Sequence, residues 1–315
     1  MLSTYKTDVY LHALGWAGGP NRAVHSSEVG VAKALPILVA LRGDGTLSVR
    51  HEMSVESMLA PLDKAALKAS KIARARSAAQ CTVFACLLAT SLAPYAKGED
   101  GKGGQDVALG VVCSSAIVPI FWRYEPVGLT QGWHMTDTTL LPASIPSAVG
   151  TACSMVTDYH AAAMTFGDGA LGMIGAVDFA ASGFANERFG SLLLVASDEA
   201  SPPMLVAGEK LGVNRAILDG ASGFVLTAQR RSAGDLRVAF AGVQAHPQRG
   251  DDLPEGWAGA QSVRGQIPDG YTMYTGNLLP QLLLLALQAT TGPKVIVELE
   301  LAGRATCRIG LESAT

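Results

Sequence analysis

The stretch from Leu141 to Pro202 constrains the fold most strongly, because it alternates small-residue helical segments with short apolar runs. We expect it to form a helix, a short strand, a tight Gly-Asp-Gly corner, a second helix and a buried strand. These segments are, in order, Val149–His160, Ala163–Phe166, Gly167–Gly169, Ala170–Ala185 and Ser191–Ser197. A strand that turns sharply into a helix presents one residue at the helix N-terminus, where free backbone N–H groups converge. The corner is therefore the first candidate for a functional site.

The rest of the chain alternates predicted strands with predicted helices, a pattern typical of a layered α/β fold. Further strands are expected at Asp8–Leu14, Pro36–Leu41, Leu47–His51, Val107–Cys113, Ala221–Ala228, Leu236–Val243, Lys294–Leu301 and Arg304–Leu311. Helices are expected at Lys64–Leu92, Met204–Ile217 and Leu278–Ala289. Two segments are expected to be loops: Ile117–Gly132, which carries aromatic residues before Pro126, and Gln244–Gly270, which is rich in Gly, Pro and Asp.

The composition indicates a heavily buried protein that associates with other subunits. The 315 residues are 49% hydrophobic, and only 16% of them are charged. Because charged surface keeps a monomer soluble, so low a share favours a large oligomeric interface. The formal net charge of −3 leaves no basic footprint for nucleic acid.

The sequence predicts no metal site, no nucleotide site and no membrane span. The five cysteines stand in apolar surroundings, which is typical of buried thiols, and no pair has metal-ligand spacing near a histidine. Gly101–Gly104 lacks the Lys-Ser/Thr of a phosphate loop. The most apolar run, Leu282–Leu287, is too short to cross a bilayer, and the N-terminus has no signal-peptide pattern. We therefore expect a cytoplasmic protein without a cofactor.

The order of these elements resembles that of a β-ketoacyl synthase, a condensing enzyme of the thiolase fold. The resemblance covers most of residues 1–243 and leaves a thinner trace near the C-terminus. It implies a thiolase-like layered α/β/α fold, with a ketosynthase-like half at 1–243 and a truncated half at 244–315 packed on the same core. The chain is most similar to the short, cysteine-less chain-length-factor-type subunits of type II polyketide and aryl polyene systems.

In that family the corner carries the nucleophilic cysteine, and here it contains none. The corner reads Phe166, Gly167, Asp168, Gly169 and Ala170. The resemblance also implies two catalytic histidines, one in a His-Gly-Thr-Gly-Thr loop and one in an Asn-x-x-Gly-His turn. After His160 the sequence contains only His246, without such a loop, and Asn277 stands in a degraded form of the turn. The resemblance thus implies a degenerate site at residues 166–170 and Asn277.

Cys153 is the rival candidate for a catalytic residue. Thr151-Ala152-Cys153-Ser154 matches the family's nucleophile tetrapeptide letter for letter, and His160 or His246 would then serve as the base. However, the Pro146-Ser147 turn is too close upstream to leave room for the family's intervening helix, loop and strand. We expect Cys153 to lie inside a helix. In the alternative arrangement, a helix from Ser154 to Phe166 is followed directly by a strand at Ala170–Ala176.

The resemblance implies one of two functions. In the first, the chain is a non-catalytic homologue that pairs with an active ketosynthase, or with itself, and shapes the acyl-chain tunnel in polyketide or fatty-acid-type elongation. Contact with the acyl carrier protein would then be indirect. In the second, it is an active condensing or acyl-transfer enzyme that carries the acyl group on Cys153. The strand before the corner would form the subunit interface, flanked by the aromatic segment Phe121–Tyr124; its residues are Ala163, Met164, Thr165 and Phe166.

Overall fold

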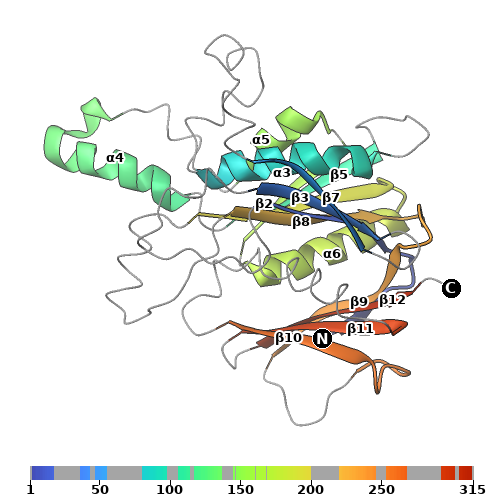
Figure 1. Ribbon diagram of the computed structural model, residues 1–315. Helices are drawn as coiled ribbons and strands as arrows, with labels where there is room; N and C mark the ends of the chain where they lie inside the picture. Colours follow the sequence, from blue (N-terminus) through green and yellow to red (C-terminus); the bar gives the residue numbers. More distant parts are fainter. Residues whose placement is uncertain are drawn as a thin grey trace.

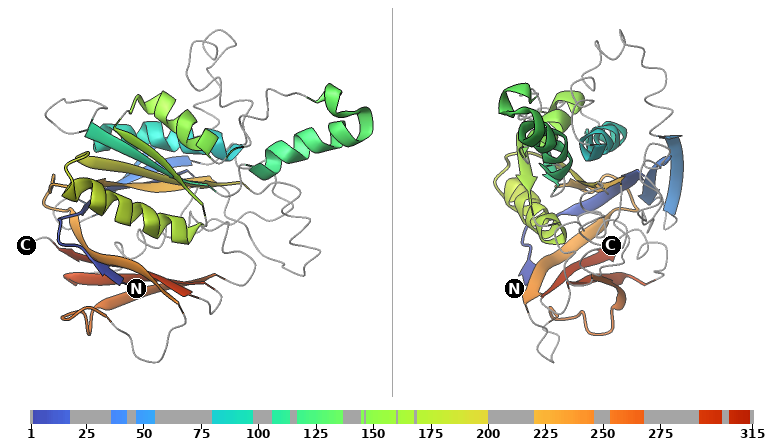
Figure 2. Two further views of the ribbon diagram at one scale, coloured as in Figure 1. Left: turned by 180° about the vertical axis from the view of Figure 1, so that it is seen from behind. Right: turned by 90° about the vertical axis from the view of Figure 1, so that its left-hand side faces the viewer.

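The computed structural model describes residues 2–17, 36–42, 47–54, 80–97, 106–113, 117–136, 145, 147–159, 161–167, 169–199, 220–245, 253–267, 292–301 and 305–313. Its helices and strands form layers (Figures 1 and 2). Helices α3 (Gln80–Ala96) and α5 (Ser147–Thr157) cover one face of a first set of strands. Helix α6 (Ala170–Ala185) lies between that set and a second one. Helix α4 (Ile117–Gln131) and the 3-10 helix η5 (Trp133–Met135) project from this body.

The strands fall into two sets that repeat one pattern. The first set is β2 (Tyr10–Ala17), β5 (Val107–Val112), β6 (Ala162–Phe166), β7 (Ser191–Asp198) and β8 (Gly220–Thr227). The second set is β9 (Leu236–Ala245), β10 (Gln261–Ile267), β11 (Lys294–Leu301) and β12 (Ala305–Ser313). In addition, β1 (Leu2–Thr4) pairs with β9, and the hairpin of β3 (Pro36–Arg42) and β4 (Leu47–Ser54) pairs with β2.

The repeat is visible in the strand order and directions. The first set runs β2-β8-β7-β5-β6 and the second runs β9-β12-β11-β10. In both sets two antiparallel pairs are followed by a parallel pair. The sets meet where Tyr10 and Leu11 pair with Arg237 and Leu236. Among the described strands, the second set has no strand that corresponds to β6. The division after residue 243 stays a prediction, and that residue lies within β9.

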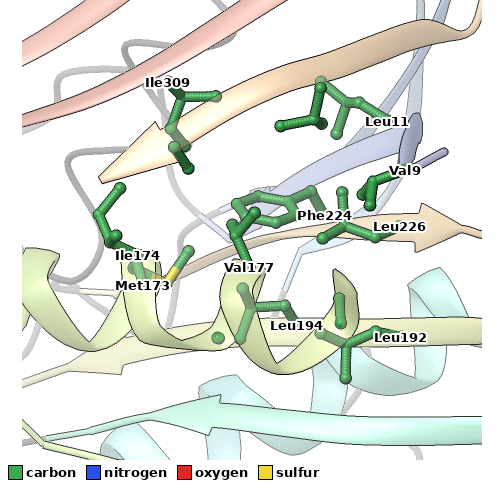
Figure 3. Packing of buried hydrophobic residues seen from close by; sticks show 14 of the residues in the cluster. Val9, Leu11, Met173, Ile174, Val177, Leu192, Leu194, Phe224, Leu226 and Ile309 are labelled. Atoms are coloured by element: carbon green, nitrogen blue, oxygen red, sulfur yellow. The ribbon is translucent and has the colours of Figure 1, made fainter. Parts of the chain in front are cut away.

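The main core lies between the two sets of strands and encloses α6. Strands β5, β7 and β8 are buried along their whole length, as expected for runs of Val, Leu, Ala and Gly covered on both faces. Helix α6 is apolar on nearly all sides because sheets cover it from two directions. In Figure 3, Val177 of α6 lies between Leu194 of β7 and Ile309 of β12, all of them in one hydrophobic cluster. Only a narrow stripe of α6, which includes Asp178 and Ser182, is exposed.

A buried ionic cluster stabilises the second set of strands. Glu298 of β11 accepts hydrogen bonds from Arg308 Nε at 2.7 Å, Arg264 Nε at 2.5 Å and Ser262 Oγ at 2.7 Å. Arg308 also donates to Gln244. Burial raises the pKa of Glu298, but the hydrogen bonds from Ser262 and Arg264 and the positive charges of Arg308 and Arg264 outweigh it, so the pKa lies below its ordinary value. The cluster ties β9, β10, β11 and β12 together.

Two predicted loops are wrong. The segment predicted as an aromatic loop is helix α4, because Pro119 stands in the first turn, where no N–H bond is needed, and the helix continues through Pro126. Helix α3 likewise continues through Pro94 to Ala96, past the predicted end at Leu92. Gln244–Gly270 contains β10, which pairs in parallel with β11. Parallel strands must be joined by a connection of about a dozen residues or more, and here β11 begins about thirty residues after β10 starts. The sequence around β10 therefore gives little sign that it pairs.

Three predicted helical segments lie outside the described residues, wholly or in part. They are Lys64–Leu92 before residue 80, Met204–Ile217 and Leu278–Ala289. The predicted strand Ala163–Phe166 and helix Ala170–Ala185 are confirmed as β6 and α6. The alternative with a helix through Phe166 and a strand at Ala170–Ala176 is wrong, because β6 ends at Phe166 and α6 begins at Ala170.

Candidate functional site

The corner between β6 and α6 is a sharp elbow centred on Gly169. Gly169 precedes α6 and has φ 54° and ψ −119°, outside the regions that residues with a side chain favour. Its carbonyl accepts the N–H of Met173 at 3.1 Å, so the helix starts directly from the strained residue. Such strand-to-helix elbows present a nucleophile when that residue carries one. Here the residue has no side chain.

The elbow is packed tightly against the first turn of α6. A Cβ atom added at Gly172 would lie 2.1 Å from the carbonyl oxygen of Gly167 and 3.1 Å from Cβ of Phe166. Only glycine permits this approach. One turn later the packing is looser, because a Cβ at Gly175 would first meet Phe166 at 3.7 Å. The glycines of the second small-residue segment thus have different roles, which composition alone does not reveal.

The elbow contacts the residues that follow the carboxyl ends of the neighbouring parallel strands. Cys113, directly after β5, donates its backbone N–H to the carbonyl of Phe166 at 3.3 Å. Its thiol donates to the thiol of Cys81 at 3.9 Å, and the N–H of Cys81 is bound by Glu199 Oε2 at 3.1 Å. The hydrogen bond with Cys113, burial and the nearby carboxylates raise the pKa of Cys81 well above its ordinary value. Ser197 completes the contact by donating to the carbonyl of Cys81 at 2.6 Å.

The structure separates Cys153 from the elbow. Cys153 lies in α5 and is 0% exposed, within the core between α3, α5 and the strands. The elbow residue Ala170 belongs to the core on the α6 side. The hydrogen bond with the thiol of Cys86, burial and the nearby thiol of Cys113 raise the pKa of Cys153 well above its ordinary value. A buried protonated thiol is a poor nucleophile.

The other predicted site residues cannot be placed. Asp168, His160, His246 and Asn277 lie outside the described residues. The sequence-predicted elbow is therefore described at Phe166, Gly167, Gly169 and Ala170.

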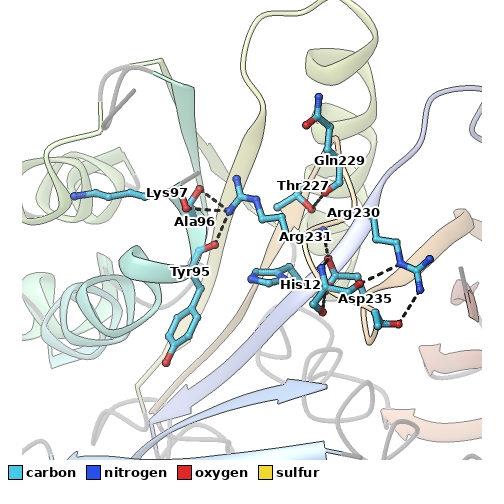
Figure 4. A network of polar contacts seen from close by, with 11 residues as sticks. His12, Tyr95, Ala96, Lys97, Thr227, Gln229, Arg230, Arg231 and Asp235 are labelled. Carbon is cyan, nitrogen blue, oxygen red and sulfur yellow. Dashed lines mark hydrogen bonds and ion pairs between the residues drawn. The ribbon is translucent and has the colours of Figure 1, made fainter. Parts of the chain in front are cut away.

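Figure 4 shows a polar network built around Arg231. It lies where β7 begins, at the end of the strands opposite to the elbow. Arg231 donates to the carbonyls of Tyr95, Ala96 and Lys97 at the C-terminal end of α3 and to Ser191 Oγ at the start of β7; the distances are 2.7, 3.1, 3.2 and 2.5 Å. It satisfies carbonyl groups that a helix end leaves without partners.

Asp235 supports this network from the turn before β9. It binds the ring of His12 at 2.9 Å and the N–H of Arg231 at 2.7 Å. Burial raises the pKa of Asp235, but the hydrogen bonds from His12, Ser232 and Arg231 outweigh it and lower the pKa below its ordinary value. His12 is thus part of a structural contact far from the elbow.

The predicted interface strand is accessible. In the described sheet β6 has one neighbour, β5, and lies at the edge. Ala163 and Met164 are exposed, Met164 to 45%, while Thr165 and Phe166 are half-buried. The packing of Phe166 against Phe179 of α6, with ring centroids 6.1 Å apart, anchors the strand end to the helix.

The projecting arm, defined as α4 and η5, is the second accessible apolar surface. Phe121, Leu129, Trp133 and Met135 are exposed, Trp133 to 55%. Trp133 folds back on Tyr124, with ring centroids 5.8 Å apart, and over Gly128, where a Cβ would lie 2.3 Å from the indole ring. Sequence reasoning found Phe121 and Tyr124 but missed Trp133, whose only signal was its proximity to the aromatic segment.

Within the described ranges, no three His, Cys, Asp or Glu side chains are grouped so that they could hold a metal ion. The helices of the same ranges include none that combines the length and apolarity needed to cross a membrane.

Comparison with known proteins shows the fold. No protein-family model and no curated protein sequence matches the chain. The ishigamide ketosynthase/chain length factor has a TM-score of 0.64 at 11% identity, covering 98% of this chain and 100% of that chain. With the same identity and coverage, a β-ketoacyl synthase from Burkholderia phymatum STM815 has a TM-score of 0.62. A type II polyketide synthase acyl-carrier protein in complex with its ketosynthase bound to the hexaketide has a TM-score of 0.61. The predicted ketosynthase-like thiolase fold is thereby confirmed.

Proposed function

We propose that the chain is a non-catalytic ketosynthase homologue that pairs with an active ketosynthase and shapes the acyl-chain tunnel in polyketide or fatty-acid-type elongation. The observation that carries the proposal is the elbow, whose strained position is occupied by Gly169. Glycine supplies no nucleophile, yet the strand, turn and helix around it keep the geometry that a nucleophile needs. Solved structures of the same fold include a ketosynthase/chain length factor.

The rival, an enzyme that uses Cys153, has less support. A catalytic cysteine needs a lowered thiol pKa, an accessible sulfur and a nearby base. The pKa of Cys153 is raised, its side chain is buried, and its thiol partner is Cys86. No observation of the described residues favours acyl transfer at this position.

The pairing surface would consist of β6 and the projecting arm. An exposed edge strand offers unpaired N–H and C=O groups, and a second subunit can satisfy them by extending the sheet. Met164 adds exposed apolar area on this edge, and Phe121 and Trp133 add exposed apolar area on the arm. Burying apolar area contributes about 25 cal/mol per Å², and permanent complexes bury more than about 2,000 Å² in total. Within the arm, Trp133 packs over Gly128 and against Tyr124, which joins η5 to α4.

Two measurements test the absence of catalysis. The purified chain should not decarboxylate malonyl-carrier protein, and iodoacetamide followed by intact-mass analysis should label Cys153 far more slowly than a free cysteine. Turnover by the isolated chain that disappears in Cys153→Ala would overturn the proposal and establish the rival.

Co-purification tests the pairing. Ala163→Arg or Met164→Arg places an unpaired charge in the proposed interface and should abolish co-purification with the active ketosynthase. Ala185→Arg is the matched control, because Ala185 is exposed at the far end of α6 and should leave the yield of complex unchanged. Wild-type co-purification of both β6 variants, or a stable monomer at micromolar concentration, would contradict the pairing.

A further inference from the structure

We draw no further inference here: the strongest candidate, the thiol pair of Cys81 and Cys113 where the start of α3 meets the end of β5, carries none, because its two sulfur atoms lie 3.9 Å apart in a packed core and nothing in the described part of the chain shows how an oxidant or an electrophile would reach them.

Discussion

Replacing Gly172 by alanine should destabilise the protein, although alanine is the better helix former. The added Cβ would lie 2.1 Å from the Gly167 carbonyl oxygen, and contacts below 3.0 Å essentially never occur. The first turn of α6 or the elbow must therefore move by about 1 Å. The atom in the way belongs to the backbone, so no side chain can rotate to relieve the contact.

The magnitude follows from two opposing effects. Alanine gains about 1 kcal/mol over glycine inside a helix. Overpacking a tight core site costs about 1–3 kcal/mol and more when backbone must shift. Because the obstructing atom is backbone, we take the upper end of that cost and expect Gly172→Ala to lose about 2 kcal/mol net. In the same helix, Gly175→Ala meets Phe166 only at 3.7 Å, an ordinary contact, and should gain about 0.5–1 kcal/mol.

Urea and thermal unfolding of the two variants decide the matter. At about 2 °C per kcal/mol for a chain of this size, Gly172→Ala should lower Tm by about 4 °C, while Gly175→Ala raises it slightly. Circular dichroism of both folded variants shows that the secondary structure is retained. Equal stability changes of the same sign in the two variants would refute the tight packing of α6 against the elbow.

Three further predictions concern the elbow and the two polar networks. Gly169→Cys should cost about 1–3 kcal/mol in urea unfolding, because the backbone at this position is strained for a residue with a side chain. Arg231→Ala should cost about 3 kcal/mol in the same assay, because it leaves carbonyl groups at the end of α3 without partners. Because the folded pKa of Glu298 is lowered, its stabilising contribution is full above about pH 4.5 and is lost as pH falls through the folded pKa. Glu298→Gln should therefore cost more stability at pH 7 than at pH 3, and an equal cost at both would contradict the assignment.

The sequence was sufficient to predict β6 and α6 because glycine and apolar periodicity mark both boundaries locally. It was insufficient for α4, since Pro126 is a strong local signal against a helix and the helix survives through its remaining hydrogen bonds. It was also insufficient for β10, whose partner strand begins at Lys294. Pairing at such a distance is decided by the tertiary fold rather than by neighbouring residues.

The candidate site was predictable in place but not in detail. The Gly-Asp-Gly corner identified the elbow, while the conformation of Gly169 and the special role of Gly172 depend on how helix and strand meet. Burial of Cys153 followed from its helical position, but its contact with Cys86 brings together two helices distant in sequence.

Glycine at the elbow has a thermodynamic consequence beyond the missing nucleophile. A residue with a side chain at φ 54° and ψ −119° would store strain of about 1–3 kcal/mol, which a catalytic protein tolerates because the chemistry requires it. Under the proposed function that requirement is absent, so Gly169 removes both the reactive group and the strain. The surrounding geometry would then be retained for another reason. The elbow fixes the end of β6, and β6 is the strand through which we propose that the partner is bound. Restoring a side chain at position 169 should therefore reduce stability without improving pairing, whereas charges on β6 should abolish pairing without changing the elbow.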